Sequence, residues 1–260
     1  IEQPDGRRML MEMKSKAEAM RALAYNCAAM YDRGANESDD ERRAYAIRRG
    51  DFLTPIVKGW CTETGQDVTS LGVQIHGGMG YIEETGAAQF FRDARITTIY
   101  EGTTGIQAGD LVGRKTLRDG GAAAQELVAE INEVAARACG SDNASIRMVG
   151  EKLNAALEST KRVMQWLIDA QADDPRLPAA ASVRYLMLWG ALCGGWQLAE
   201  SALSAHAMLA SGGEVDDEFL NSKISTAAFF ALQVMPQIDA MAEVIVEGSD
   251  SVFAIEAVAL

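Results

Sequence analysis

Apolar residues recur at steps of three and four along most of this 260-residue chain, which is the spacing of one face of an α-helix. The N-terminal stretch sets the pattern, with apolar side chains at Met9, Met13, Ala17, Met20, Leu23, Cys27 and Met30. Only 5 prolines interrupt the chain, and clusters of the β-branched residues that favour strands are few. The sequence therefore predicts an all-α fold with almost no strand.

Turn and cap residues divide this pattern into separate helices. The first is expected from about residue 5 to 31, followed by a loop over 34–37. Ser38-Asp39-Asp40-Glu41 has the order of a capping box and predicts the start of a second helix. Thr54-Pro55 supplies an N-cap residue and a proline for the first turn, which predicts a third helix that ends at Gly77-Gly78.

Helical patterns continue to the end of the chain. Further helices are expected over residues 85–92, 106–117, 122–139, 144–170 and 179–210, and in a last long helix from about 217 that Pro236 kinks. Gly120-Gly121 marks a change in composition. We interpret residues 1–120 and 121–260 as two antiparallel helical bundles, the first of the four-helix-bundle type.

Composition excludes several classes of function. The net charge of −13 argues against nucleic-acid binding, which needs clustered Lys and Arg. The four cysteines, Cys27, Cys61, Cys139 and Cys193, have no paired spacing and only 2 histidines beside them, so neither a metal site nor a disulfide framework is expected. The start of the chain lacks the apolar segment of a signal peptide. The apolar run Tyr185–Trp196 is shorter than the roughly 20 residues of a membrane span, so we expect a cytoplasmic protein.

A glycine cluster, Gln74-Ile75-His76-Gly77-Gly78-Met79-Gly80, follows the third predicted helix. Glycines let the backbone approach a ligand closely and expose N–H groups to anions such as a pyrophosphate. The cluster follows a helix rather than a strand, so it is not a dinucleotide-binding fingerprint. On the cluster alone, a helix C-cap followed by a turn is the simpler interpretation.

A single carboxylate stands in a second unusual segment, Ile99-Tyr100-Glu101-Gly102-Thr103. A base that removes a weakly acidic C–H proton needs an apolar, water-poor pocket. Ile99 and Tyr100 are candidates to wall such a pocket, and Gly102 leaves room for a substrate to approach. A glutamate beside a turn is the structural alternative.

Together the two segments are similar to the C-terminal domain of acyl-CoA dehydrogenases. The resemblance rests on Gln74 to Tyr81, then Arg92-Asp93-Ala94-Arg95-Ile96, then Ile99 to Thr103, in that order and spacing. It runs from the chain start to about residue 118. Residues 106–115 resemble a larger bacterial branch that carries an extra C-terminal helical domain, the 3-methylmercaptopropionyl-CoA dehydrogenases among them. Residues 121–260 would be that extension.

The resemblance implies an FAD enzyme that converts an acyl-CoA thioester to a trans-2-enoyl-CoA. Glu101 then matches the base that removes the α-proton, with Gly102 and Tyr100 against the substrate. The segment that contacts the FAD of a neighbouring subunit matches Gln74, Ile75, His76, Gly77 and Gly78. Thr103 matches a residue near the adenosine phosphates of FAD, and Gly105 falls at a further cofactor-contact position.

The resemblance also implies partners and a larger protein. An electron-transfer flavoprotein is the expected electron acceptor, and a homodimer or homotetramer the expected assembly. The helical domain and the β domain that precede this part in the family would lie upstream of Ile1. Two alternatives remain open: a catalytically inactive helical oligomerisation module, and a related flavin oxidase on the same scaffold.

Overall fold

The computed structural model describes residues 2–259, is 86% helical and has no strand in that range. The prediction of an all-α fold is therefore confirmed. The first half contains α1 (Pro4–Asn36), α2 (Asp40–Ile75), α3 (Gly78–Tyr81), η1 (Glu83–Thr85), α4 (Ala87–Ile96), α5 (Thr104–Gly109) and the π-helix η2 (Asp110–Leu117). The second half contains α6 (Ala122–Cys139), α7 (Ala144–Asp173), α8 (Arg176–Ser211), α9 (Asp217–Gln233), α10 (Gln237–Gly248), η3 (Ser249–Phe253) and η4 (Ala257–Ala259).

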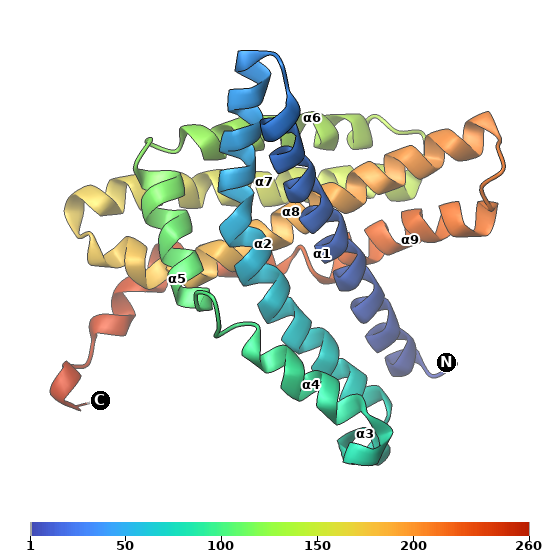
Figure 1. Ribbon diagram of the computed structural model, residues 1–260, viewed down its shortest axis with the longest axis horizontal. Coiled ribbons are helices and arrows are strands. Elements are labelled where there is room, and N and C mark those ends of the chain that lie inside the picture. Colours follow the sequence, from blue (N-terminus) through green and yellow to red (C-terminus); the bar gives the residue numbers. More distant parts are fainter. Residues whose placement is uncertain (1, 260) are drawn as a thin grey trace.

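The long helices lie in two sets that cross each other (Figure 1). α1 and α2 form an antiparallel pair that runs steeply across α7 and α8, and both contact α8. The second set consists of α6, α7, α8 and α9, which run along the long axis of the molecule. The C-terminal half of α2 projects beyond the crossing, with α4 packed along it and α3 at its tip. We call the residues 62–100 of this projection the arm.

The prediction that a separate helix begins at Thr54-Pro55 is wrong, because both residues lie inside α2. The Thr54 hydroxyl donates to the Gly50 carbonyl at 2.8 Å, so Thr54 does not cap a helix start. Pro55 removes one backbone donor, which costs stability within a helix. The apolar neighbours Phe52 and Ile56 are almost fully buried, and this packing offsets the missing hydrogen bond.

Two other boundaries also differ from those expected from the sequence. α1 continues to Asn36, into the predicted loop, and still packs on α2 there, since a Cβ at Gly34 would lie 3.0 Å from the Ile47 side chain. Pro236 does not kink one long helix but separates α9 from α10. The amide of Met235 bonds back to the Phe230 carbonyl at 3.1 Å, and the chain resumes a helix only after the proline.

Asp39 caps α2, since its carboxylate accepts from the Arg42 amide at 2.9 Å. We expect Asp39→Ala to lower the free energy of unfolding by about 1 kcal/mol, the usual cost of losing an N-cap. Thermal unfolding of this variant checks it. Ser38→Ala is the matched control, because Ser38 precedes the cap and makes no hydrogen bond within residues 2–259. Equal melting temperatures for the two variants would contradict the assignment of the cap to Asp39.

One apolar core joins the two halves of the chain, and α8 lies at its centre. Trp189 packs edge-to-face on Phe52 of α2, with ring centroids 5.1 Å apart, and on Tyr185, at 6.2 Å. The Tyr185 hydroxyl contacts the Thr116 hydroxyl of η2 at 3.1 Å. The predicted bundles therefore share buried side chains, and the division at residue 120 stays a prediction.

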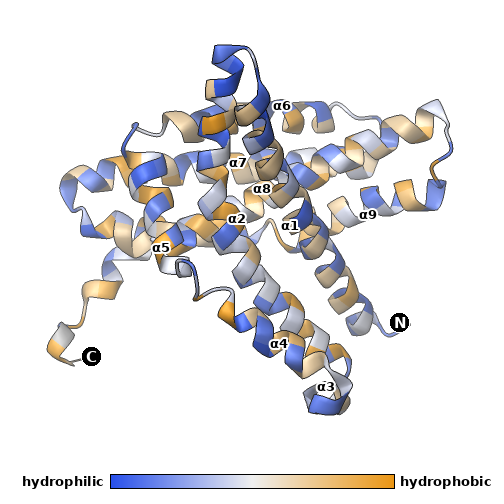
Figure 2. Cartoon of the chain, in the orientation of Figure 1, coloured by the Kyte–Doolittle hydropathy of each residue, from blue (hydrophilic) through white to orange (hydrophobic). Residues whose placement is uncertain are grey.

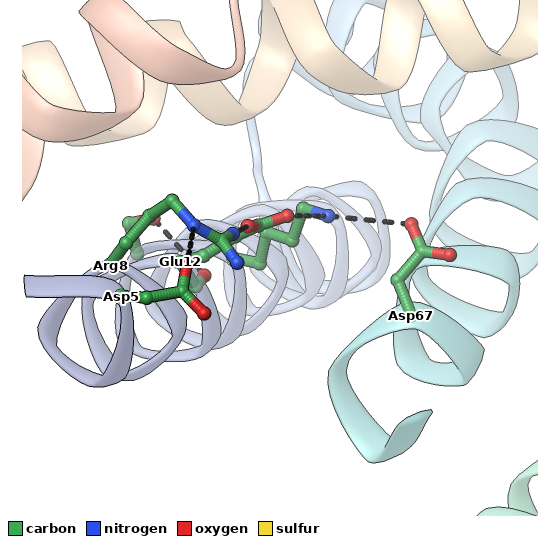
Figure 3. A network of polar contacts seen from close by, with 6 residues as sticks. Asp5, Arg8, Glu12 and Asp67 are labelled. Carbon is green, nitrogen blue, oxygen red and sulfur yellow. Dashed lines mark hydrogen bonds and ion pairs between the residues drawn. The ribbon is translucent and has the colours of Figure 1, made fainter. Parts of the chain in front are cut away.

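Charged contacts also tie α1 to the arm. Lys16 is buried against Glu12, one turn earlier, at 2.8 Å, and reaches Asp67 of α2 at 3.3 Å. Figure 3 shows this network continuing along α1 to Arg8 and Asp5. Because Lys16 is desolvated between two carboxylates, its contacts fix the spacing of α1 and α2 where the arm begins.

The four thiols are unpaired, and Cys27 and Cys193 are buried. Burial raises the pKa of Cys61 and of Cys193 to about 12, so both stay protonated at neutral pH. Among residues 2–259 no group of three or more metal-ligating side chains is found.

One stretch, Asp217–Phe253, is apolar and long enough to cross a membrane by length and composition alone. Its most apolar window has a mean hydropathy of 1.4, and 39% of that window is buried. Pro236 divides it into two helices, and Phe230, Ile238 and Ile245 lie in the core. Part of the stretch therefore packs in the core, and the absence of a membrane span stays a prediction.

Candidate functional site

Glu101 lies in the turn between α4 and α5, in a backbone conformation that is rare for a residue with a side chain. Its φ is 52°, and it is the one non-glycine residue with positive φ in the described range 2–259. Gly102 follows with φ 96°, and a Cβ there would lie 2.7 Å from Nε2 of Gln107. Two consecutive residues with positive φ turn the chain sharply at Glu101, which is exposed.

Hydrogen bonds within the turn close it around these two residues. The Thr104 amide donates to the Thr98 carbonyl at 3.1 Å. Thr103 caps α5, because its hydroxyl accepts from the Ile106 amide at 3.3 Å. The turn thus joins α5 through a capped helix start, and its backbone is fixed on the C-terminal side of Glu101.

The side chains at the turn face outward. Glu101 is exposed, and its carboxylate makes no hydrogen bond or ion pair within residues 2–259. Ile99 and Tyr100, the expected walls of an apolar pocket, are 47% and 49% exposed. An unpaired carboxylate with two half-exposed apolar neighbours is a surface that a ligand or another protein part can cover.

The glycine cluster lies at the tip of the arm, where α2 ends. His76 forms the C-cap of α2, and its Nδ1 donates a hydrogen bond to the Gly72 carbonyl at 2.6 Å. Gly77 has φ 60° and ψ −146°, a conformation that glycine adopts readily, and nothing lies within 4 Å of where its Cβ would be. The helix-capping interpretation of this cluster is correct for its local structure.

Two pockets, each lined by residues of both α2 and α4, lie near the cluster. Gln74 lines one of about 430 Å³, together with Tyr81 and Arg92. His76 lines a second, more apolar pocket of about 270 Å³, together with Phe90. Arg92 is not free there, because its guanidinium pairs with Glu83 at 2.5 Å. Hydrophobic and hydrophilic residues are interspersed along α4 (Figure 2).

The predicted site residues therefore form two groups. Gln74, Ile75, His76, Gly77 and Gly78 lie at one end of α4. The other group, Tyr100, Glu101, Gly102, Thr103 and Gly105, lies at the opposite end. α4 has 10 residues, about 15 Å of helix, so no single small pocket in this chain holds both groups.

Sequence reasoning missed two residues of α2 that contact the turn. Lys58 donates to the Thr97 carbonyl and Glu63 accepts from the Thr104 hydroxyl. The partners of these two pairs are 39 and 41 residues apart in the sequence, so no local sequence pattern predicts the contacts. The available signal was weak and applied to one of them: Lys58 is a charged residue among the largely apolar residues Ile56 to Trp60.

Two family models match the chain. Residues 1–116 match "Acyl-CoA dehydrogenase, C-terminal domain", and residues 127–256 match "Acetyl-CoA dehydrogenase C-terminal like". The chain is 47% identical to 3-methylmercaptopropionyl-CoA dehydrogenase of Ruegeria pomeroyi over 96% of its own length. The match spans 42% of that relative, so the chain covers less than half the length of this curated protein.

Solved structures share the fold. An acyl-CoA dehydrogenase of Caenorhabditis elegans, crystallised with C11-CoA, superposes with a TM-score of 0.71 at 18% identity, over 95% of this chain and 41% of that one. An acyl-CoA dehydrogenase of Bacillus anthracis, crystallised with FAD, gives 0.69 at 20% identity, over 98% of this chain and 44% of that one. The family models, the curated relative and the shared fold agree, and the chain belongs to the acyl-CoA dehydrogenase family, in the C-terminal helical part of its members.

Proposed function

We propose that the protein containing this chain is an FAD-dependent acyl-CoA dehydrogenase and that Glu101 is its base. The observation that carries the proposal is Glu101 itself, an exposed carboxylate without a partner in residues 2–259, in a positive-φ turn that continues into Gly102. Family membership supplies the reaction class. The curated relative's name, a dehydrogenase of an acyl-CoA thioester, and the C11-CoA and FAD of the two solved neighbours support the substrate and cofactor classes.

The residues present fit the cofactor. The open space around Gly77 lets the backbone approach a flat or anionic group that a Cβ would keep away. Gln74, beside Arg92 in the larger pocket, offers an amide that donates and accepts. We assign Gln74 to Gly78 to the FAD of a neighbouring subunit, and Thr103 and Gly105 to the FAD nearest Glu101. When bound, FAD accepts the hydride that leaves the β-carbon of the thioester.

The carboxylate of Glu101 takes the proton from the α-carbon. It is suited to this role because no cation within residues 2–259 neutralises it. Gly102 brings backbone, without a side chain, next to the reacting carbons, and Tyr100 covers the acyl chain. Loss of one proton to Glu101 and one hydride from the β-carbon removes two hydrogens and leaves a trans-2-enoyl-CoA.

The reaction requires further partners. Electrons taken from the substrate must leave the flavin, and we propose an electron-transfer flavoprotein as acceptor. A homodimer or homotetramer in the cytoplasm would place the arm of one copy beside the flavin of the next. The exposed apolar side chains of the arm, Met79, Tyr81, Phe90 and Phe91, suit such a contact.

The same apolar arm favours the second candidate, an inactive helical module that only assembles copies. The two functions differ in one measurement. The flavin-loaded protein is mixed with acyl-CoA thioesters of several chain lengths and an artificial electron acceptor. The mass of the thioester after the reaction is then measured by mass spectrometry. A product two hydrogens lighter supports the dehydrogenase. An unchanged thioester with an oligomeric, flavin-free protein supports the module, and reduction of oxygen without the acceptor supports an oxidase.

A further inference from the structure

We infer that Lys58 and Glu63 of α2 are positioning residues that hold the Glu101 turn from both sides. The inference rests on the proposed function, because it concerns the place of the base in that reaction. Lys58 contacts the chain four residues before Glu101, and Glu63 contacts it three residues after. α2 is a 36-residue helix anchored in the core, so both contacts tie the turn to a rigid element.

Lys58 holds the N-terminal side of the turn. Its ammonium donates to the Thr97 carbonyl and stands 5.4 Å from the centre of the Tyr100 ring. Lys58 is half-buried and has no carboxylate partner within residues 2–259. The Lys58 ammonium therefore interacts with the turn itself: with the Thr97 carbonyl at the C-terminal end of α4, and with the ring of Tyr100, which precedes Glu101.

Glu63 holds the C-terminal side. Its carboxylate accepts a hydrogen bond from the hydroxyl of Thr104, which is only 9% exposed. Glu63 has no cationic partner within residues 2–259, so this hydroxyl is the donor it has in the structure. The Thr104 amide also donates to Thr98, so Glu63 fixes the point where the turn closes.

The two contacts matter because the turn is not in a relaxed conformation. A left-handed glutamate persists only when the surrounding structure holds it in place. The hydrogen bonds inside the turn fix its shape, and the hydrogen bonds of Lys58 and Glu63 fix that shape relative to α2, in addition to the packing of α4 and α5 on α2. Loss of either contact allows the carboxylate of Glu101 to shift from its position. A misplacement of about 1 Å can lower the rate of a positioned reaction about 100-fold.

The test uses the flavin-loaded holoenzyme with Lys58→Met, which keeps the aliphatic stem and removes the donor. We expect kcat to fall about 10- to 100-fold while KM changes less than about threefold. The substrate isotope effect on kcat, measured with an α-deuterated thioester, should rise, because proton removal becomes slower. Lys58→Arg should restore kcat to within about threefold of wild type, since it keeps a cationic donor. Lys152→Met, an exposed lysine on α7, is the control.

The second contact has its own pair of variants. Thr104→Val removes the donor with little change in shape and should raise the isotope effect as Lys58→Met does. Glu63→Gln keeps an oxygen that accepts from Thr104 and should stay close to wild type. Wild-type kcat and isotope effect in both Lys58→Met and Thr104→Val would overturn the inference. If Glu101→Gln turned over normally, the proposed function would fail instead, so the two failures are distinguishable.

Discussion

We expect Gly190→Ala to lower the free energy of unfolding by about 3 kcal/mol, the upper part of the range for overpacked cores. Gly190 lies on α8 where it crosses α2, and a Cβ there would stand 2.0 Å from Cγ of Trp60. The indole cannot move aside, because Trp60 is 3% exposed and also meets Gly194, one turn further along α8. The two helices must therefore separate at the centre of the shared core.

Thermal unfolding of the purified chain measures this effect. A loss of about 3 kcal/mol lowers the melting temperature by about 6–12 °C in a domain of roughly this size. Gly65→Ala is the matched control: Gly65 lies inside α2, and nothing lies within 4 Å of its Cβ position. There alanine should raise stability by about 0.5–1 kcal/mol, because it favours the helix. Equal melting temperatures for both variants would show that the crossing is not closely packed.

We expect Glu101→Gln to lower kcat by a factor of about 10² to 10⁴ in the flavin-loaded enzyme, the contribution of a general base. Gln keeps the length and shape of the side chain but cannot take up a proton. The exposed position of Glu101 and its lack of partners within residues 2–259 mean that the change should not disturb folding. Flavin content and melting temperature should therefore stay at the wild-type level.

A matched control separates the base from a general effect of charge. Glu151→Gln removes the same charge from an exposed glutamate of α7, far from the arm in the sequence, and Glu151 makes no hydrogen bond or ion pair within residues 2–259. Its kcat should equal that of wild type. A similar loss of activity in both variants would assign the effect of Glu101→Gln to electrostatics of the surface rather than to proton transfer.

The helices could be predicted where local chemistry decides them. Asp39, Asn143 and Asp216 cap helices with their side chains, and a Ser/Thr/Asn/Asp residue before an apolar periodic run is a local signal. The helix start predicted at Thr54-Pro55 was wrong because proline occurs both at helix starts and inside buried helices. Packing of Phe52 and Ile56 against the core decided between them, and that packing involves residues far away in the sequence.

The candidate site was predictable to a similar extent. Glu101 and the glycine cluster could be found because each is a short, contiguous motif. The left-handed backbone of Glu101 was not predictable from propensity, since glutamate seldom adopts it. Lys58 and Glu63 were missed because their role depends on α4 folding back along α2, which brings the turn beside them. Local sequence patterns can therefore predict a reactive group, but the residues that position it can be found only from the tertiary structure.

The most direct test of Glu101 as the base is a single turnover without an electron acceptor. Flavin-loaded wild-type protein and Glu101→Gln are each mixed rapidly with saturating acyl-CoA in the absence of oxygen, and the absorbance of oxidised flavin is followed. We predict that the wild-type absorbance is lost in one turnover. In Glu101→Gln we predict that the flavin stays bound and oxidised over the same time. Loss of absorbance in Glu101→Gln at the wild-type rate would contradict the assignment.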